Sequence, residues 1–436
     1  MEKLYRALFV SFLAIIAITI TSCEDDEICP GITCAIGQLQ LIDCTCIEDP
    51  SNGSSSGEQI VSENITEDVT WTSDICYILG GRIVVEAGAT LTIEPGTLIK
   101  GETGQGTNST SLLVARGATI NAEGTADAPI IFTSVADEIQ QGMIASPNLD
   151  SSISGLWGGV LILGNAPISA DAEAVQIEGV PPSDQNGLYG GTDPNDNSGV
   201  FRFVSIRHGG TDIGEGNEIN GLTLGGVGNG TTIDHVEIIA NVDDGIEFFG
   251  GTVNCSDLIV VMQGDDAFDG DQGYSGTVNN FVSIAGSESD HALEFDGPEG
   301  ATNGTYTFTN GTCRGFNVDG VDGGEYADFR SNLMANLSDV YFFNFSETSD
   351  FELDNDGVAA NYLDGLITTS GLEFNVSHLT GGNLDCESIM QDNSTEGTAF
   401  DQIDPGCSIV TDPSVGANTS EFNGWTWAQA SGILNF

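Results

Sequence analysis

Acidic residues recur at regular intervals in the second half of this 436-residue sequence. Segments 243–247, 265–269 and 290–294 each begin with an acid and end with an apolar residue followed by an acid, and looser copies occur at 319–322 and 351–352. The last acids of these segments are spaced by 22, 25, 28 and 30 residues: Glu247, Asp269, Glu294, Asp322 and Glu352. Such a period is typical of stacked structural repeats. Stacked carboxyl groups could exchange protons with a substrate, hold cations, or simply face water.

The direction of these acids follows from strand geometry, because alternate side chains of a strand face opposite sides. If Ile246, Phe268 and Leu293 point into a core, the acids that follow them point outward. If each strand stays extended, two further rows share that outer face: Gly245, Ala267 and Ala292, and Asp243, Asp265 and Asp290. A last row is expected at the bend before each strand: Asp244, Asp266 and His291.

Stacked acids repel one another unless something offsets their charge. At about 5 Å, two like charges cost about 0.8 kcal/mol in water and about 3 kcal/mol at an effective dielectric of 20. Calcium is the natural counter-ion, because it takes six to eight oxygen ligands in flexible geometry. The sequence therefore predicts calcium as a cofactor, with these candidate ligands: Asp243, Asp265, Asp269, Asp290, Glu247 and Glu294. The alternative is a hydrated acidic face with raised pKa values.

The composition is strongly acidic, with 65 Asp and Glu against 9 Lys and Arg and a formal net charge of −56. A negative field of this size repels nucleic acid and attracts cations, so nucleic acid is excluded as a partner. Hydrophobic residues make up 39% of the chain and are interleaved with the acids. We therefore expect a folded protein with a long, thin core rather than a disordered acidic tail.

Residues 1–22 have the pattern of a secretory signal, with Lys3 and Arg6 before an apolar run over 7–20 and small residues before Cys23. Their removal leaves 64 acids and 7 bases. A cysteine here resembles the cleavage site of bacterial lipoproteins, in which that cysteine carries the lipid. The acidic run over 24–27 resembles the surface-export signal of Bacteroidetes-type lipoproteins. These resemblances imply an outer-membrane protein that is anchored through Cys23 and exposed at the cell surface; the alternative for the run is a merely solvated tether.

The remaining cysteines fit an oxidising compartment. Four of them fall within 18 residues and predict two disulfides of undetermined pairing: Cys29, Cys34, Cys44 and Cys46. A zinc site is the competing interpretation, although no histidine lies nearby. Cys386 and Cys407 are 21 residues apart and are expected to meet across one repeat. Cys76, Cys255 and Cys313 leave an odd thiol without an assigned partner.

The chain divides into an acidic tether over 23–28, a Cys-rich knot over 29–48, a linker over 49–59 and a repetitive region over 60–436. The last region alternates short apolar strands with Gly-, Asn- and Asp-rich turns, for example at 82–85, 90–93, 130–133, 160–163, 258–260 and 341–343. Strands of three to five residues stack readily as coils of a parallel β-helix. A propeller, the rival architecture, needs a longer period. Residues 170–199 are expected to form a lateral loop, Trp71–Leu79 to start the stack, and Trp425 and Trp427 to seal its end.

Three segments carry a resemblance to a known fold: Gly88–Thr97, Gly124–Ser134 and Trp157–Val160. They are similar to the opening coils of pectin-lyase-like right-handed β-helix proteins. The resemblance implies an all-β, single-stranded, right-handed parallel β-helix of about a dozen coils, preceded by the small disulfide-rich segment. The resemblance identifies the fold specifically but gives little information about activity.

The order and spacing of four residues are similar to the motifs of polygalacturonase-type β-helix hydrolases: Asp244, Asp265, Asp266 and His291. In that reading Asp265 or Asp266 is the acid, Asp244 the base that activates water, and His291 an orienting group. The glycines that flank the histidine and the Arg-x-Lys that reads a uronate are missing, since Arg330 is followed by Ser331 and Asn332. A lyase would need a base such as Arg207, Arg314 or Arg330.

The sequence therefore favours a lipid-anchored surface protein that binds or displays, with an extracellular glycan or surface protein as partner. The alternative is a polysaccharide-degrading enzyme with its site on coils 241–297. An aromatic floor above those coils would mark a glycan groove, and Phe249, Tyr274 and Phe295 are the candidates for it.

Overall fold

The computed structural model describes residues 57–436 except 105, 107–108, 213–217, 319–320 and 380–383, together with the backbone of a short hairpin at 38–40 and 46–48. The chain divides into two compact units, 1–55 and 56–436. The predicted signal, Cys23 and the proposed disulfides of the Cys-rich knot lie outside the described side chains. Within the described residues, no helix is long and apolar enough to cross a membrane.

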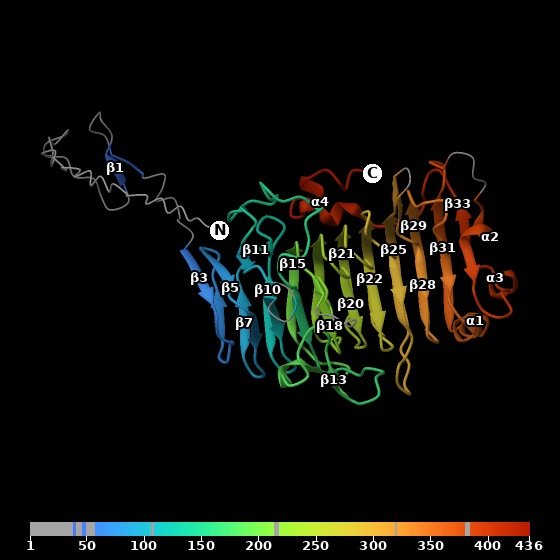
Figure 1. The fold of residues 1–436 in the computed structure, drawn as a ribbon, viewed down its shortest axis with the longest axis horizontal. Coiled ribbons are helices and arrows are strands. Elements are labelled where there is room, and N and C mark those ends of the chain that lie inside the picture. Colours follow the sequence, from blue (N-terminus) through green and yellow to red (C-terminus); the bar gives the residue numbers. More distant parts are fainter. Residues whose placement is uncertain are drawn as a thin grey trace, which may run out of the picture. The chain divides into compact units, whose positions relative to one another are not determined.

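Residues 56–436 form coils whose parallel strands stack into two main sheets (Figure 1). The shorter strands make a ten-stranded sheet, called the short sheet here: β6 (Arg82–Val85), β9 (Ser111–Val114), β12 (Val160–Leu163), β18 (Leu222–Gly225), β20 (Ile246–Phe249), β22 (Phe268–Asp271), β24 (Leu293–Phe295), β28 (Ala327–Phe329), β30 (Phe351–Leu353) and β32 (Met390–Asp392). Successive coils contribute neighbouring strands, as the sequence period predicts.

The second sheet, called the long sheet, has twelve strands on its main path among the described residues: β3 (Gly57–Val61), β5 (Ile75–Leu79), β8 (Leu98–Gly101), β11 (Ile130–Ser134), β15 (Gly199–Arg207), β19 (Thr232–Ile239), β21 (Cys255–Val261), β23 (Thr277–Ile284), β25 (Tyr306–Arg314), β29 (Ala335–Phe343), β31 (Ile367–Asn375) and β33 (Cys407–Ile409). Three more strands form a branch on the early coils: β4 (Val69–Trp71), β7 (Thr90–Ile93) and β10 (Thr119–Glu123). The right-handed parallel β-helix of about a dozen coils is confirmed. It begins at β3, one strand before the predicted start.

The long strands bend because one residue in each adopts a left-handed conformation. These residues form a column in register, with φ between 48° and 69°: Phe203, His235, Asp257, Asn280, Asn310, Asp339, Gly371 and Gly406. Most are Asn, Asp or Gly, which tolerate this region best. The bend lets one strand line two sides of the coil.

The interior is a single apolar column filled by the inward residues of both sheets, such as Ile246, Phe268 and Leu293. Tyr274 and Phe295 belong to this core, and Phe249 packs beneath Tyr189 on the opposite face of the short sheet. The predicted aromatic floor is therefore wrong, because these rings are buried.

The segment between β12 and β15 lies against the outer face of the short sheet, as the predicted lateral loop. It contains a hairpin of β13 (Val175–Gln176) and β14 (Leu188–Tyr189) and the 3₁₀ helix η2 (Gln185–Gly187), seen at the bottom of Figure 1. Its Ile177 and Tyr189 pack on Leu113 and Leu161. We call residues 164–198 the covering segment.

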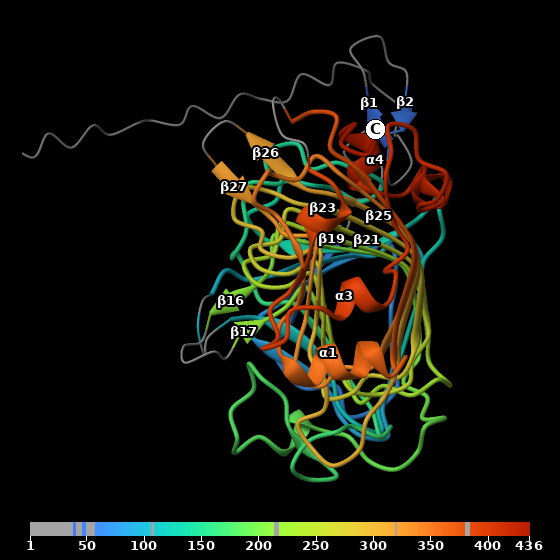
Figure 2. The same cartoon turned by 90° about the vertical axis from the view of Figure 1, so that its right-hand side faces the viewer.

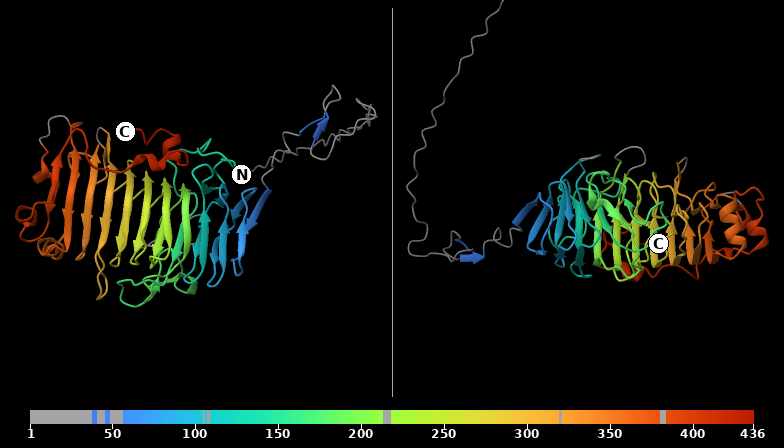
Figure 3. Two further views of the ribbon diagram at one scale, coloured as in Figure 1. Left: turned by 180° about the vertical axis from the view of Figure 1, so that it is seen from behind. Right: turned by 90° about the horizontal axis from the view of Figure 1, so that it is seen from below.

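The C-terminal segment runs back along the outer face of the long sheet (Figure 3). It contains η3 (Thr419–Phe422) and α4 (Trp427–Ala430), and its Trp425 and Trp427 pack on sheet residues such as Ile259 and Val282. The buried Glu237 accepts the backbone N–H groups of Trp427 (3.0 Å) and Ala428 (2.9 Å). The prediction that these tryptophans seal the end of the stack is therefore wrong.

Helices cover the C-terminal end of the stack instead (Figure 2). They are α1 (Asp356–Leu363), α2 (Cys386–Ile389) and α3 (Ala399–Gln402), and the rings of Tyr362 and Phe400 lie 5.0 Å apart between α1 and α3. Such a cover protects the last strands from edge pairing.

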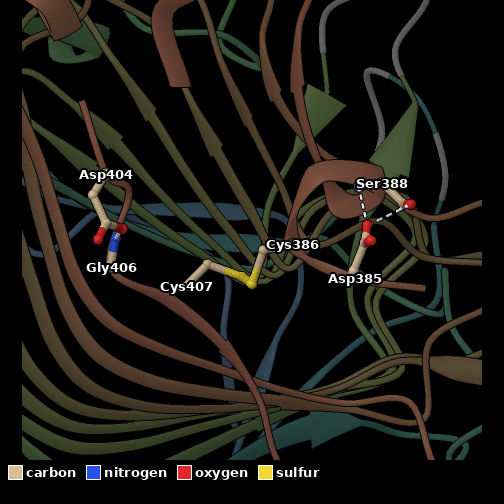
Figure 4. Close-up of a disulfide and its surroundings, with 6 residues drawn as sticks. All are labelled: Asp385, Cys386, Ser388, Asp404, Gly406 and Cys407. Carbon is tan, nitrogen blue, oxygen red and sulfur yellow. Dashed lines mark hydrogen bonds between the residues drawn. A yellow bond between two sulfur atoms is a disulfide. The ribbon is translucent and has the colours of Figure 1, made fainter. Parts of the chain in front are cut away.

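The predicted disulfide between Cys386 and Cys407 is confirmed and joins α2 to β33 (Figure 4). Asp385 begins α2 by accepting the N–H of Ser388 at 3.0 Å. Cys76, Cys255 and Cys313 are buried free thiols among the described residues. The sequence left one odd thiol among these three cysteines, whereas the structure leaves all three unpaired.

Candidate functional site

One outward-facing column of the short sheet contains three of the predicted site residues, Glu247, Asp269 and Glu294. The paired residues are, in coil order, Val84, Leu113, Leu161, Thr223, Glu247, Asp269, Glu294, Asp328, Glu352 and Gln391. The first three are apolar and lie beneath the covering segment. We call the five acids from Glu247 to Glu352 the acidic column; the strands that carry them, β20 to β30, run from yellow-green to orange in Figure 1.

One predicted member of this column is wrong. Asp322 lies on a lateral hairpin formed by β26 (Phe316–Val318) and β27 (Val321–Gly323), where its backbone pairs with Asn317. Asp328 on β28 pairs with Glu294 and takes its place. The inserted hairpin interrupts the period, which explains why spacing alone selected the wrong acid.

The chain bends before each short strand, so one predicted row faces the other way. Ala267 and Ala292 lie in the core, and a Cβ on Gly245 would come within 2.3 Å of the core residue Val260. The outward direction expected for this row is therefore wrong, because the backbone is not extended there.

The row at the bend uses its carboxylates to link successive coils. Asp244 Oδ1 accepts the N–H of Asp266 at 2.9 Å, and Asp266 Oδ1 accepts the N–H of His291 at 2.7 Å. Asp266 Oδ1 also lies 2.8 Å from His291 Nδ1. Asp244 and Asp266 are both buried. These two candidate catalytic acids therefore hold the stack together, whatever else they do.

Two clusters of carboxyl groups meet around Asp244. Oxygens of Asp244, Glu247 and Asp269 lie within 4.8 Å of one another, and so do oxygens of Asp243, Asp244 and Asp265. Burial, followed by the charges of neighbouring acids, raises the pKa values of Asp244, Glu247 and Asp269 well above their ordinary range. Burial and the charge of Glu218 raise the pKa of Asp243 to about 8. Without a cation, burial and the charges of neighbouring acids favour the protonated forms of these groups.

Two basic groups, His291 and Arg330, contact the later part of the acidic column. His291 Nδ1 lies 3.1 Å from Glu294, and the Arg330 guanidinium pairs with Glu294 and, at 3.2 Å, with Asp296. Burial lowers the pKa of His291, but the hydrogen bond and charge of Asp266 outweigh it and raise that pKa to about 9. Burial raises the pKa of Asp328 to about 7 despite the opposing charge of His291.

The six predicted calcium ligands do not form one site. Asp243 and Asp265 form one cluster with Asp244. Glu247 and Asp269 form another cluster, also with Asp244. Glu294 meets Asp266 and His291 instead. Asp290 stays outside them, with 56% of its side chain exposed. The structure thus separates the ligands between neighbouring coils.

The cluster of Asp244, Glu247 and Asp269 has the donor set that a hard cation requires. All its donors are carboxylate oxygens, and Asn220 contacts Glu247 through its amide. Asn220 Oδ1 is buried without a hydrogen-bond partner among the described residues. Calcium prefers such oxygen ligands, so these four residues fit it.

Two further residues of this region, Glu178 and Asp271, were missed by sequence reasoning. Glu178 comes from the covering segment, and burial with the charge of Glu218 raises its pKa to about 7. Asp271 follows Asp269 on β22, and burial with the charge of Asp296 raises its pKa to about 7. The repeated acids gave a signal for Asp271, whereas nothing in the sequence places Glu178 here.

Comparison with known proteins identifies the fold. A family model described as a pectate-lyase like beta helix domain matches residues 63–429. No curated protein and no solved structure matches the chain. The match covers most of the chain and agrees with the stacked parallel sheets. The chain therefore belongs to the family of pectate-lyase-like β-helix domains.

Proposed function

We propose that this protein binds polysaccharide on the acidic column of its short sheet. The observation that carries the proposal is the unbroken series of five carboxyl groups on adjacent coils. Coils of a β-helix repeat every 4.7–4.9 Å or so, which offers an extended polymer evenly spaced hydrogen-bond acceptors. Sugar hydroxyl groups can donate to such acceptors, and ionised acceptors make the stronger bonds.

The open end of the column favours a polymer ligand. Glu294 and Asp328 keep 14% and 13% of their side chains exposed, and Glu352 is also partly exposed. Arg330, with 37% of its side chain exposed, adds a donor between them. A mixed row of acceptors and one donor suits a hydroxyl-rich chain better than a strongly anionic one, since the net charge of the protein is −56.

The test is binding to a panel of polysaccharides in affinity gels. We expect retardation of the wild type and a marked decrease of that retardation in Glu294→Gln/Asp328→Asn/Glu352→Gln. The matched control is Glu347→Gln/Asp364→Asn/Glu396→Gln, which removes the same charge at exposed positions away from the column. Equal retardation of both variants would overturn the proposal.

A specific observation favours polysaccharide cleavage as a second candidate. Asp243, with its pKa raised to about 8, lies beside the exposed Asp265. Glycoside hydrolysis needs two carboxyl groups, one protonated and one ionised, and close placement suits the retaining mechanism. Release of reducing ends by the wild type, lost in Asp243→Asn and in Asp265→Asn, would establish this activity. A lyase would instead give unsaturated products and would depend on Arg330.

We also propose that calcium binds Asp244, Glu247 and Asp269 and that lipid on Cys23 anchors the protein to the outer membrane. The carboxylate cluster supports the first proposal, and the signal-like residues 1–22 support the second. Labelling of cells with an alkyne-tagged fatty acid tests the anchor. We expect label in the wild type and none in Cys23→Ala.

A further inference from the structure

The outer face of the long sheet contains an open groove, far in sequence from the early acidic repeats. Its volume is about 800 Å³, and strands β25 and β29 form its base. Val340 and Phe342 on β29 lie in the core. Tyr341 and Phe343, which alternate with them along the strand, therefore point outward. Their rings are stacked, with centroids 5.2 Å apart and planes 10° apart. They give the groove an aromatic floor.

One wall of the groove is residues 413–417 of the C-terminal segment, which are held firmly. Glu373 accepts the N–H of Ser414 at 2.6 Å, and Thr312 Oγ1 accepts the N–H of Ala417 at 2.8 Å. Gly416 has φ 130°, and a Cβ there would lie 2.8 Å from Thr312 Oγ1. The wall is therefore formed before any ligand arrives, which lowers the entropic cost of binding.

Polar groups and a third ring complete the rim. Asn310 and Asp339 belong to the left-handed bend column, with φ of 59° and 57°. Phe436 is 49% exposed, and its ring lies 5.0 Å from that of Phe343. Among the described residues that line the groove, Asp339 has the only charged side chain. An anionic ligand would therefore find repulsion and no cationic partner.

We propose that this groove binds a sugar ring of a neutral glycan, packed against the aromatic pair Tyr341 and Phe343. A pyranose has an apolar face bordered by hydroxyl groups, which matches an aromatic floor bordered by amide, hydroxyl and carboxylate groups. The site is separate from the acidic column, since it lies on the other sheet. The inference goes beyond the proposed function and does not depend on it.

The test is calorimetric titration with neutral hexasaccharides: cellohexaose, xylohexaose, maltohexaose and N-acetylchitohexaose. Hexagalacturonate and a hexapeptide containing Tyr and Trp serve as comparison probes. We expect at least one neutral sugar to bind the wild type, with affinity lowered about tenfold or more in Tyr341→Leu/Phe343→Leu. The two leucines keep apolar side chains over the sheet. A second variant, Asp339→Gly, removes a polar group of the rim and leaves Tyr341 and Phe343 unchanged; glycine tolerates the left-handed φ at this position.

The acidic-column variant Glu294→Gln/Asp328→Asn/Glu352→Gln should keep the binding that belongs to the groove, and adding Tyr341→Leu/Phe343→Leu to that variant should remove it. This separates failure at the groove from failure at the acidic column. The proposal is overturned if no neutral hexasaccharide binds, if a folded Tyr341→Leu/Phe343→Leu binds as tightly as the wild type, or if only the acidic-column variant loses binding. Binding of the peptide in place of the sugars would also overturn it.

Discussion

The outer column of the short sheet has an apolar half and an acidic half. Val84, Leu113 and Leu161 occupy it on the early coils, and the acids from Glu247 to Glu352 occupy it on the later ones. The inward residues of both halves are apolar and belong to one core. The fold therefore depends on the inner column, which leaves the outer column free to be covered in one half and to meet ligands in the other.

The covering segment explains why the first half is apolar. Ile177 and Tyr189 of that segment remove Leu113 and Leu161 from water, and Tyr189 donates a hydrogen bond to Gln272 at 2.9 Å. In the second half, Glu247 is also nearly buried, at 5% exposure, but it is an acid. Burial of an unpaired charge is costly, so this acid must be protonated or bound to a cation.

The largest expected effect comes from placing an acid in the apolar half. Leu161→Glu would bury a carboxyl group among Leu113, Ile177 and Tyr189. We expect a loss of about 3–5 kcal/mol in the free energy of unfolding, measured by denaturant titration at pH 7. Leu161→Met, which conserves volume, is the control and should cost less than about 1.5 kcal/mol. Equal stability of Leu161→Glu and Leu161→Met would show that the two halves are equivalent.

Calcium should stabilise the protein through the acidic half alone. At 100 times its Kd, a ligand that binds only the folded state adds about 2.7 kcal/mol. We expect a higher Tm at pH 8 with calcium than with a chelator, and no such difference in Glu247→Gln/Asp269→Asn. An unchanged Tm for the wild type would contradict calcium binding at this cluster.

The pH dependence of the calcium-free protein should follow from the raised pKa values. Folded Asp243, Asp328 and Asp271 titrate near 8, 7 and 7, against an unfolded value near 3.8. Between about pH 4 and pH 8 the folded state therefore binds more protons than the unfolded state does. The free energy of unfolding is greatest at the acid end of this window and falls as pH rises. His291, raised from 6.5 to about 9, acts in the same direction up to pH 9.

Thermal melts with chelator at pH 5, 6, 7 and 8 check this sign. We expect Tm to fall with pH, and calcium to reduce or reverse the fall because it binds ionised carboxylates. A Tm that rises with pH in the presence of chelator would mean that the acids are already ionised in the folded protein.

The smallest effect is expected from removing charge within the acidic half. Glu247→Gln/Asp269→Asn replaces two crowded carboxyl groups by neutral isosteres, so the calcium-free protein should gain about 1–2 kcal/mol at pH 8. Denaturant titration at pH 8 and pH 5 measures the gain, which should shrink at pH 5. If the variant is less stable than the wild type at both pH values, hydrogen bonding by these carboxyl groups outweighs their repulsion.

The fold could be predicted because the inner column repeats along the sequence. Ile246, Phe268 and Leu293 recur at the same place in each coil, and the structure places all three in the core. The position of Asp328 could not be predicted, because the β26–β27 hairpin lengthens that coil. The cover over Leu161 and the location of Trp425 depend on packing between segments distant in sequence, which periodicity does not encode.

The groove of Tyr341 and Phe343 was also missed, although both residues were read as part of a strand. Alternation with Val340 and Phe342 shows that they point outward only once the register of β29 is known. The opposite wall comes from residues 413–417, which no local pattern connects to β29.

Carboxyl footprinting of the acidic column tests the central claim most directly. The protein is treated with a carbodiimide and an amine, with and without a polysaccharide that retards it in affinity gels. The modification of each acid is then measured by mass spectrometry. We predict that polysaccharide lowers modification of Glu294, Asp328 and Glu352 but not of the exposed control acids Glu347 and Asp364. Unchanged modification of the three column acids while polysaccharide is bound would contradict the account.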